Sequence, residues 1–367
     1  MDLVDTNDAG IKPVGVAHGT DFVAMVKPSK MQAEAFQAAA AADRLAAQLQ
    51  PQLRELGAVL RALDPLLVMT CARGSSDHAA TYAKHLIETR LRIPAASHTP
   101  SISSVYETKW RSLERTVFLA ISQSGRSPDL LISAKVARQA GALILAVVND
   151  ESSPLFDEAD HAIPLVAGPE RSVAATKSYI SSLLVALLLV AEWVEDDALA
   201  QAVVGSGDLL RAAWSLDWSI ASPILIGAHG LYVVGRGSTL GIAQEAALKL
   251  KETSAIHAEA VSAAEIRHGP LALVKNGFPT LMFVPADAAA EGFADLAQLL
   301  VECGANVICA GAQFDGCIEL PTVAGVHPAL APVAMIQSFY RLAATVSVGR
   351  GCDPDHPAHL HKVTRTR

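Results

Sequence analysis

The sequence predicts an α/β protein that consists of two copies of one unit with parallel strands and crossover helices. Two observations support this prediction. Short apolar runs alternate with helical stretches between residues 64 and 150, a pattern typical of parallel strands joined by helices. The segment around residue 70 also recurs later in the chain, which indicates an internal repeat.

The first elements are helical. An irregular segment is expected up to about residue 20. Residues 31–56, MQAEAFQAAAAADRLAAQLQPQLREL, are rich in Ala, Leu, Gln and Glu and predict a helix, which we expect to be interrupted or kinked near Pro51. Further along, the apolar block SYISSLLVALLLVAEW at 178–193 contains three serines and is shorter than a membrane span, so we expect a buried helix.

Strands and helices alternate between these two helices. The runs DPLLVMTCA, RTVFLAIS and ALILAVVND predict buried strands, whereas HAATYAKHLIETRL and PDLLISAKVARQAG predict helices.

The repeat has a constant offset. Residues 68–88 resemble residues 231–252, and Gly74 matches Gly237, which gives an offset of 237 − 74 = 163. The same offset places 141–150 on 304–313, and it places the strand before residue 122 on PTLMFV. We therefore expect a loose N-terminus at 1–20, a first domain at 21–200, a second at 201–350, and a tail at 351–367.

Composition narrows the partners and the compartment. The chain has 29 Lys and Arg against 37 Asp and Glu, and it has no long basic run, so neither nucleic acid nor a membrane is expected as a partner. The start MDLVDTNDAG is polar and acidic, unlike a signal peptide. Five cysteines without CxxC spacing favour a reducing, cytoplasmic location and no zinc site.

The stretch ISQSGRSPD at 121–129 follows a predicted strand and combines three serines with Gly125. Backbone N–H groups at a helix start together with serine hydroxyls can hold a phosphate, but the same stretch can also be a capped loop. Under the offset of 163, SQSG falls on PADA at 285–288, which has no serine. Because the second copy folds without these serines, the difference favours a phosphate-binding loop over a merely capped one.

A second stretch, 245–270, is rich in ionisable groups. On a helix, Glu245, Lys249 and Glu252 share one face, and a solvated, salt-paired face is the more ordinary interpretation of that spacing. His268 precedes Gly269 and Pro270 in an expected loop, where a histidine is more often structural than catalytic.

Six motifs together resemble the sugar isomerase (SIS) family, and more narrowly the isomerase half of the glucosamine-6-phosphate synthases. They are GSS at 74–76, SQSGRS at 122–127, AATKSY at 174–179, EAALKLKE at 245–252, AEIRHGPLAL at 264–273 and HLHKVTRT at 359–366. The resemblance runs from about residue 25 to the end of the chain.

The resemblance implies two tandem SIS domains, each a doubly wound αβα sandwich with a mainly parallel five-stranded sheet. It further implies a substrate site in the first domain. The sugar phosphate would be held by Ser122, Gln123, Ser124 and Ser127, and the sugar would contact Ser75, Ser76, Val173 and Ala175. The family pattern has serine where this chain has Ala175, so one sugar contact is expected to be missing or replaced by water.

The resemblance also assigns catalytic roles. Glu252 matches the family's proton-transfer carboxylate, His268 its ring-opening histidine and Lys362 its tail lysine, while Lys249 would lie beside the open-chain sugar. No metal or other cofactor is implied. The family places the histidine in the site of the partner subunit, so a homodimer with shared active sites is expected.

One departure bears on the reaction. The synthases carry an N-terminal glutaminase domain whose nucleophile is the cysteine after Met1, whereas this chain has Asp2 and its first cysteine is Cys71. We therefore expect a glucosamine-6-phosphate deaminase that converts its substrate and water to fructose 6-phosphate and ammonia. The tail GCDPDHPAHLHKVTRT resembles those of stand-alone SIS-type deaminases. The alternatives are a galactosamine-6-phosphate deaminase or isomerase, a sugar-amine 6-phosphate deglycase, a synthase subunit with a separate glutaminase, and a non-catalytic sugar-phosphate sensor.

Overall fold

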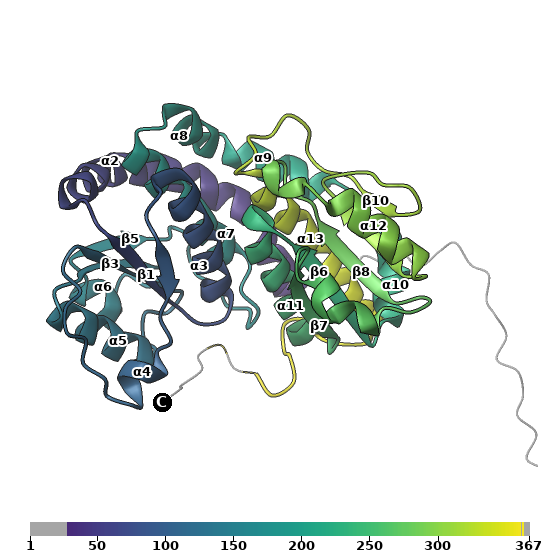
Figure 1. The fold of residues 1–367 in the computed structure, drawn as a ribbon, viewed down its shortest axis with the longest axis horizontal. Helices are drawn as coiled ribbons and strands as arrows, with labels where there is room; N and C mark the ends of the chain where they lie inside the picture. Colours follow the sequence, from purple (N-terminus) through teal and green to yellow (C-terminus); the bar gives the residue numbers. More distant parts are fainter. Residues whose placement is uncertain (1–27, 361, 363–367) are drawn as a thin grey trace, which may run out of the picture.

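The computed structural model describes residues 28–360 and 362 (Figure 1). The irregular segment expected at 1–20 therefore lies outside the described residues, as does most of the tail after Leu360.

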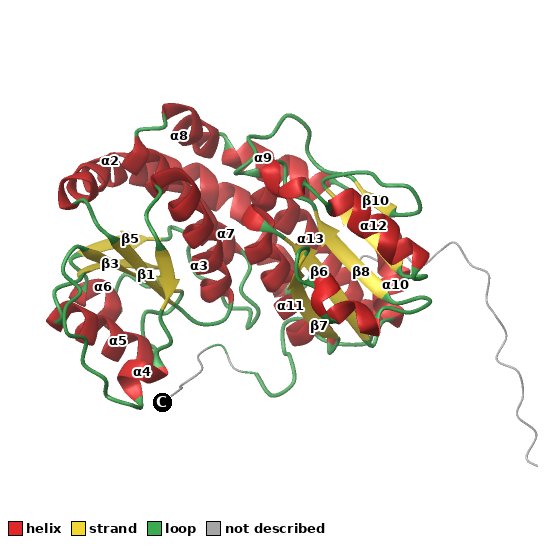
Figure 2. Cartoon of the chain, in the orientation of Figure 1, coloured by secondary structure: helices red, strands yellow, loops and turns green. Residues whose placement is uncertain are grey.

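The described chain contains two five-stranded sheets in which every strand pair is parallel (Figure 2). The strand order is β2-β1-β3-β4-β5 in the first sheet and β10-β9-β8-β6-β7 in the second. If β6 to β10 are matched in turn to β1 to β5, the two orders are the same, so the predicted tandem α/β fold is confirmed. The strands are β1 (Leu67–Cys71), β2 (Ala95–Ser97), β3 (Thr116–Ser122), β4 (Leu143–Val148), β5 (His161–Pro164), β6 (Gly230–Gly235), β7 (His257–Ser262), β8 (Pro279–Phe283), β9 (Asn306–Ala310) and β10 (Ile318–Leu320).

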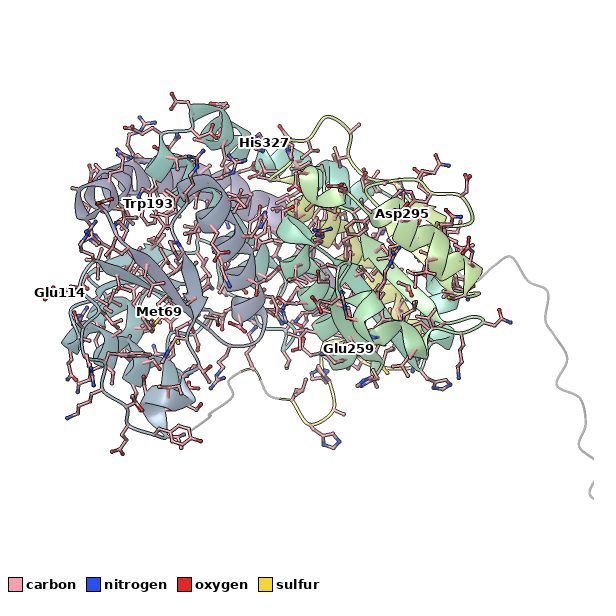
Figure 3. All side chains as sticks on the ribbon, in the orientation of Figure 1. Met69, Glu114, Trp193, Glu259, Asp295 and His327 are labelled. Carbon is pink, nitrogen blue, oxygen red and sulfur yellow. The ribbon has the colours of Figure 1, made fainter. Side chains whose placement is uncertain are left out.

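Helices cover both faces of each sheet, because successive strand residues face opposite sides. In β3, Val117 and Leu119 join a core with α2, α3 and α7, whereas Phe118 and Ala120 join a second core with α5. Figure 3 labels one side chain from each side of the first sheet, Trp193 and Met69. The bounds are α2 (Ala38–Leu63), α3 (Ser75–Leu86), α5 (Pro128–Gln139) and α7 (Lys177–Val194). The first repeat is thus a doubly wound sandwich.

A single large core joins the two repeats. It contains residues of both sheets and of the helices between them, including α11 (Leu240–Ser254) and α13 (Ala331–Gly349). In Figure 1 these helices lie between the two sheets. The domain boundary near residue 200 stays a prediction, since α9 (Ser206–Ser215) packs on both α2 and α13.

The apolar block at 178–193 forms most of α7. By length and composition this helix could cross a membrane, but 94% of its residues are buried inside the protein. The predicted buried helix is confirmed, and the serines of its first half are buried with the leucines.

The predicted interruption at Pro51 is wrong. The helix break lies at Gln37, between α1 (Lys30–Phe36) and α2, and α2 continues through Pro51. Proline deprives the helix of one hydrogen bond, which is tolerated here because Pro51 is exposed while the opposite side of α2 is buried against α7. Packing therefore outweighs the local preference.

The remaining helices are short connections or covers of the outer faces. They are the π-helical turn Ile87–Leu91, α4 (Ser101–Ser104), α6 (Pro154–Glu158), α8 (Asp197–Val204), α10 (Ser222–Gly227) and α12 (Phe293–Glu302), with 3-10 turns at Ser219–Ala221, Gly237–Thr239, Ile266–His268, Pro270–Leu273 and Ala288–Ala290.

Candidate functional site

A cleft of about 340 Å³ opens at the carboxyl ends of β1 and β3. The strand order reverses direction between these two strands, and a doubly wound sheet binds its ligand at such a switch point. The volume lies within the range of about 300–1,000 Å³ that is typical of small-molecule sites. Its walls come from five segments, which belong to both repeats and the tail: Arg73, Gly74, Ser75, Ser76, Ile121, Ser122, Gln123, Ser124, Ser127, Leu130, Val173, Ala175, Glu252, Leu360 and Lys362.

The serine loop forms one wall of this cleft. The Ser122 hydroxyl accepts a hydrogen bond from the Gly125 N–H at 3.0 Å, which closes the turn after β3. The Ser124 hydroxyl accepts a longer bond of 3.4 Å from the Arg126 N–H. These bonds order the loop and leave the hydroxyl protons available to a ligand.

Ser127 stands at the N-cap of α5, where its hydroxyl would ordinarily accept a bond from the helix. Here its side chain makes no capping hydrogen bond, and the first turn begins with Pro128. The interpretation of 121–129 as a merely capped loop is therefore wrong in this respect. A serine that lines a cleft at a helix N-terminus without capping it is available to bind an anion.

Gly125 is required by the shape of the loop. Its φ of +61° lies in the left-handed region, and a Cβ at this position would come within 2.1 Å of the Ser153 hydroxyl. The loop can therefore fold back on the start of α6 only with glycine here.

A second side of the cleft is lined by Glu252 of α11, and the charged face of this helix behind Glu252 is buried. The side chains of Glu245 and Lys249 have no exposed area, and that of Glu252 is 19% exposed at the cleft. The Lys249 Nζ lies 2.5 Å from the Glu252 Oε2 and 3.4 Å from the Glu245 Oε1. The expectation of a solvated face is wrong, because α3 and α13 cover this side of α11.

Neutral and aromatic groups complete this charge cluster. Glu245 accepts hydrogen bonds from the Ser75 hydroxyl at 3.1 Å and the Tyr340 hydroxyl at 3.2 Å, and its other oxygen lies 3.1 Å from the His78 Nδ1. Lys249 also donates to the Ser75 hydroxyl at 3.2 Å. Ser75 thus links the cleft wall to the buried cluster.

The cluster favours the charged forms of Glu245 and Lys249. Burial alone would raise the pKa of the Glu245 carboxyl, but Lys249 and His78 hold it below its ordinary value. Burial alone would lower the pKa of the Lys249 ammonium, and the carboxylates of Glu245 and Glu252 raise it instead. The arrangement therefore fixes an ionised lysine directly behind the Glu252 carboxylate.

The loop before α7 forms the third wall and is anchored by Glu170. This buried carboxylate accepts hydrogen bonds from the Thr176 N–H at 3.0 Å and from the Ser178 hydroxyl at 2.6 Å. The tail returns from the second repeat, and its Lys362 Nζ lies 3.3 Å from the Glu170 Oε2. Lys362 is thereby held at the cleft wall beside Val173 and Ala175.

Helix α1 supports the same loop from behind. The buried Glu34 carboxylate accepts the Arg171 N–H at 2.6 Å and the Ser172 N–H at 3.0 Å. At the other end of α1, the tail residue Asp355 accepts the Lys30 and Met31 N–H groups at 2.7 and 2.9 Å. One short helix therefore connects the tail to the loop of the cleft.

The structure gathers ten of the twelve predicted site residues around this cleft. Two lie elsewhere: Lys249 is buried behind Ser75 and Glu252, and His268 is exposed in the turn Ile266–His268. A place for His268 in a partner's cleft stays a prediction. The ten are Ser75, Ser76, Ser122, Gln123, Ser124, Ser127, Val173, Ala175, Glu252 and Lys362.

The second repeat has a different cavity at the corresponding edge of its sheet. That cavity measures about 170 Å³ and is lined mainly by small and apolar residues, among them Ala286, Gly311 and Met335. Ala286 is the counterpart of Gln123 under the offset of 163. The stretch PADA at this edge has no serine, so the serine loop has a counterpart in neither sequence nor cavity lining there.

The sequence did not single out Arg73, Asp129, Glu170 or Glu34. Arg73 lines the cleft, and its Nε and Nη2 lie 3.0 and 2.7 Å from the Asp129 Oδ2. The only available signal for Arg73 was its position beside the GSS motif. The two glutamates act through contacts between segments that are distant in the sequence, which no local pattern reveals.

Fold and site define this protein as a tandem, doubly wound α/β protein with a polar cleft at the switch point of its first sheet. Comparison with known families is consistent with this class. The model of the SIS domain matches residues 68–192 and 224–310, which is more than half of the chain. The protein therefore belongs to the SIS domain family.

Individual relatives agree with this assignment. Glutamine–fructose-6-phosphate aminotransferase (isomerizing) of Symbiobacterium thermophilum is 34% identical over 331 residues, which are 84% of this chain and 53% of the relative. The chain thus spans about half the length of the curated relatives it matches. A crystal structure from Silicibacter pomeroyi, titled "putative phosphosugar isomerase", is 40% identical with a TM-score of 0.85 and covers 89% of this chain and 100% of its own.

A third comparison concerns a part of a larger enzyme. The C-terminal domain of glucosamine-fructose-6-phosphate aminotransferase from Francisella tularensis has a TM-score of 0.80 at 26% identity. The match covers 92% of this chain and 100% of that domain.

Proposed function

We propose that this protein is a sugar-phosphate isomerase of the SIS type, and more narrowly a glucosamine-6-phosphate deaminase. The observation that carries the proposal is that the serine loop, Glu252 and Lys362 line one cleft. A phosphate held by the loop would leave the sugar carbons extending toward Glu252. The names of the similar proteins, phosphosugar isomerase and fructose-6-phosphate aminotransferase, support the same substrate class.

The first chemical requirement is to bind and open the sugar. Hydroxyls of Ser124 and Ser127 and N–H groups at the start of α5 would donate to the phosphate. Opening of the ring moves a proton between the ring oxygen and the anomeric hydroxyl, which an imidazole can do near neutral pH. The resemblance to the family assigns this step to His268 of a second subunit, since His268 does not line the cleft of its own chain and could act only from outside it.

The second requirement is to move a proton between C2 and C1. A single base that reaches both carbons can do this, and the Glu252 carboxylate lies at the cleft wall with its Oε2 fixed by Lys249 at 2.5 Å. In the proposed reaction, Glu252 takes the C2 proton of open-chain glucosamine 6-phosphate and returns a proton to C1. The enolamine between these steps becomes the C2 imine, and water hydrolyses that imine to fructose 6-phosphate and ammonia.

The choice of deamination rests on the tail. Residues 351–366 resemble the tails of stand-alone SIS-type deaminases, and Lys362 of this tail lines the cleft. A synthase-type subunit is the second candidate, because the curated relative from Symbiobacterium thermophilum is named as an aminotransferase. Such a subunit would make glucosamine 6-phosphate from fructose 6-phosphate only when a partner supplies nitrogen.

The test is ammonia release from purified protein given glucosamine 6-phosphate, galactosamine 6-phosphate or unphosphorylated glucosamine in parallel. We expect release from the first substrate, and release that is at least about a hundredfold slower with the variant Glu252→Gln. Release from galactosamine 6-phosphate alone would reassign the substrate. Binding of glucosamine 6-phosphate without release from any substrate would contradict the deaminase and favour a sensor or a synthase subunit.

A further inference from the structure

We propose that Arg73 is a phosphate-binding residue of the cleft and that Asp129 holds its guanidinium in place. This inference deepens the proposed function, since it assigns the phosphate end of the substrate. It starts from a feature of the serine loop, whose own donors are hydroxyls, an amide and backbone N–H groups. All of these donors are neutral, so a cation beside them would compensate the charge of a phosphate dianion further.

The position of Arg73 fits this need. Arg73 directly precedes Gly74 and Ser75 after β1, and it lines the same cleft as Ser127. Its guanidinium is bound to Asp129, which lies in the first turn of α5 and only two residues after Ser127. The cation is therefore held at the helix end where the phosphate is expected.

The geometry leaves part of the guanidinium free for a ligand. Both Nε and Nη2 of Arg73 donate to one oxygen of Asp129, at 3.0 and 2.7 Å. Within the described residues, the Arg73 Nη1 donates no hydrogen bond, and the Arg73 side chain is 49% exposed. An arginine presents five N–H groups in a planar fork, so the edge away from Asp129 can donate to a phosphate oxygen.

Asp129 also explains why a cation is needed here. Its side chain is 1% exposed, and its other oxygen accepts the Leu130 N–H at 2.9 Å. A buried carboxylate at the start of α5 would repel a phosphate at the same helix end. With Arg73 bound to it, this carboxylate becomes a positioning group for the cation.

The second repeat offers an internal comparison. Under the offset of 163, Arg73 matches Arg236, but Asp129 matches Gly292. The Arg236 Nη1 donates instead to the Glu291 carbonyl oxygen at 3.2 Å. The repeat that has no serine loop therefore has no counterpart of the Arg73–Asp129 pair, which supports a link between this pair and phosphate binding.

The chain supplies a closely matched control in Arg126. This arginine lies in the serine loop itself, is 45% exposed, and donates from Nε and Nη2 to one oxygen of Asp150 at 3.1 and 2.9 Å. It differs from Arg73 in that it does not line the cleft and in that its Nη2 also donates to the carbonyl and hydroxyl oxygens of Ser152, each at 3.1 Å. Both arginines thus have similar exposure and pairing, and only one faces the ligand.

The experiment measures binding of fructose 6-phosphate and of inorganic phosphate by calorimetry to the wild type and to Arg73→Gln and Arg126→Gln. Loss of one charge-assisted contact predicts about tenfold weaker binding of both probes to Arg73→Gln. Arg126→Gln is expected to bind as the wild type does. Equal binding by Arg73→Gln and the wild type, or no binding of either probe to the wild type, would overturn the proposal.

A double variant separates direct contact from an effect on Asp129. Arg73→Gln removes the Arg73 guanidinium from the Asp129 carboxylate, so Asp129→Asn is added to remove the negative charge of that carboxylate as well. If Arg73 binds phosphate, the double variant still binds about tenfold more weakly than the wild type. Recovery of wild-type affinity would mean that Arg73 only neutralises Asp129, and the proposal would be wrong. Arg73-dependent binding without ammonia release would contradict the proposed function alone.

Discussion

The hydroxyl of Ser127 offers the sharpest test of the serine loop. We consider the variant Ser127→Ala, which removes the hydroxyl and leaves the backbone of the α5 N-terminus unchanged. Because the side chain makes no capping hydrogen bond, its loss is not expected to destabilise the helix. If the hydroxyl instead binds a phosphate, the loss removes one hydrogen bond to a charged group.

The expected magnitude follows from that bond. Hydrogen bonds to charged groups contribute about 1.5–3 kcal/mol, and 1.4 kcal/mol is a factor of ten in affinity. The Kd for fructose 6-phosphate and the KM for glucosamine 6-phosphate should therefore rise about 10- to 100-fold. The melting temperature should change little, because Ser127 makes no capping hydrogen bond. Loss of a true N-cap would instead cost about 1 kcal/mol and lower the melting temperature by a few degrees.

The assay compares calorimetric Kd and melting temperature for the wild type, Ser127→Ala and Ser215→Ala. Ser215 is a suitable control because its exposed hydroxyl donates only to the Ala212 carbonyl oxygen at the end of α9. Ser127→Ala with an unchanged Kd and a lowered melting temperature would show that the hydroxyl caps the helix. That result would refute the phosphate assignment of the loop.

Three further predictions concern a carboxylate that lines the cleft, Glu252, and two that lie behind its walls, Glu34 and Glu245. Glu252→Gln should lower kcat by about 10²- to 10⁴-fold, the usual contribution of a general base, and leave the Kd for fructose 6-phosphate within about threefold of the wild type. If kcat and the affinity for fructose 6-phosphate fell by similar factors, Glu252 would have a binding role instead. Glu34→Ala should raise KM and lower the free energy of unfolding in urea by about 2 kcal/mol, because two N–H groups of the cleft loop lose their acceptor, with Glu34→Gln in between; an unaltered KM would separate α1 from the site. The pKa of Glu245 is lowered in the fold from its ordinary value of 4.5, so its stabilising effect is present above that pH and is lost as the pH falls below it. The gap in unfolding free energy between the wild type and Glu245→Gln should therefore narrow as the pH falls below about 4.5; a gap that widens would contradict the ion pair with Lys249.

Much of the fold was predictable because the sequence contains the same unit twice. The offset of 163 that aligns Gly74 with Gly237 also aligns β4 with β9 residue for residue at their starts, Leu143 and Asn306. Short, continuously apolar runs that alternate with helical stretches predicted the parallel strands, since parallel strands are buried on both faces of the sheet. Pro51 was misjudged because the packing of α2 against α7 decides that helix, and local sequence does not contain this contact.

The site was predictable where residues follow one another after a strand, as in the serine loop. The buried state of Glu245 and Lys249 was not predictable, because helical spacing shows which residues share a face and not what covers that face. Glu34 was missed for a related reason, since its partner Arg171 lies 137 positions away. His268 does not line the cleft of its own chain. Its place in the cleft of a partner subunit, which the family resemblance implies, stays a prediction.

The most direct test of the proposed reaction is a product balance measured by NMR and an ammonia assay. Purified protein is incubated with glucosamine 6-phosphate, and fructose 6-phosphate and ammonia are quantified in the same sample over time. Our account predicts that both products appear in equal amounts and that both form at least about a hundredfold more slowly with Glu252→Gln. Glucosamine 6-phosphate that stays intact while the wild type binds it would contradict the account.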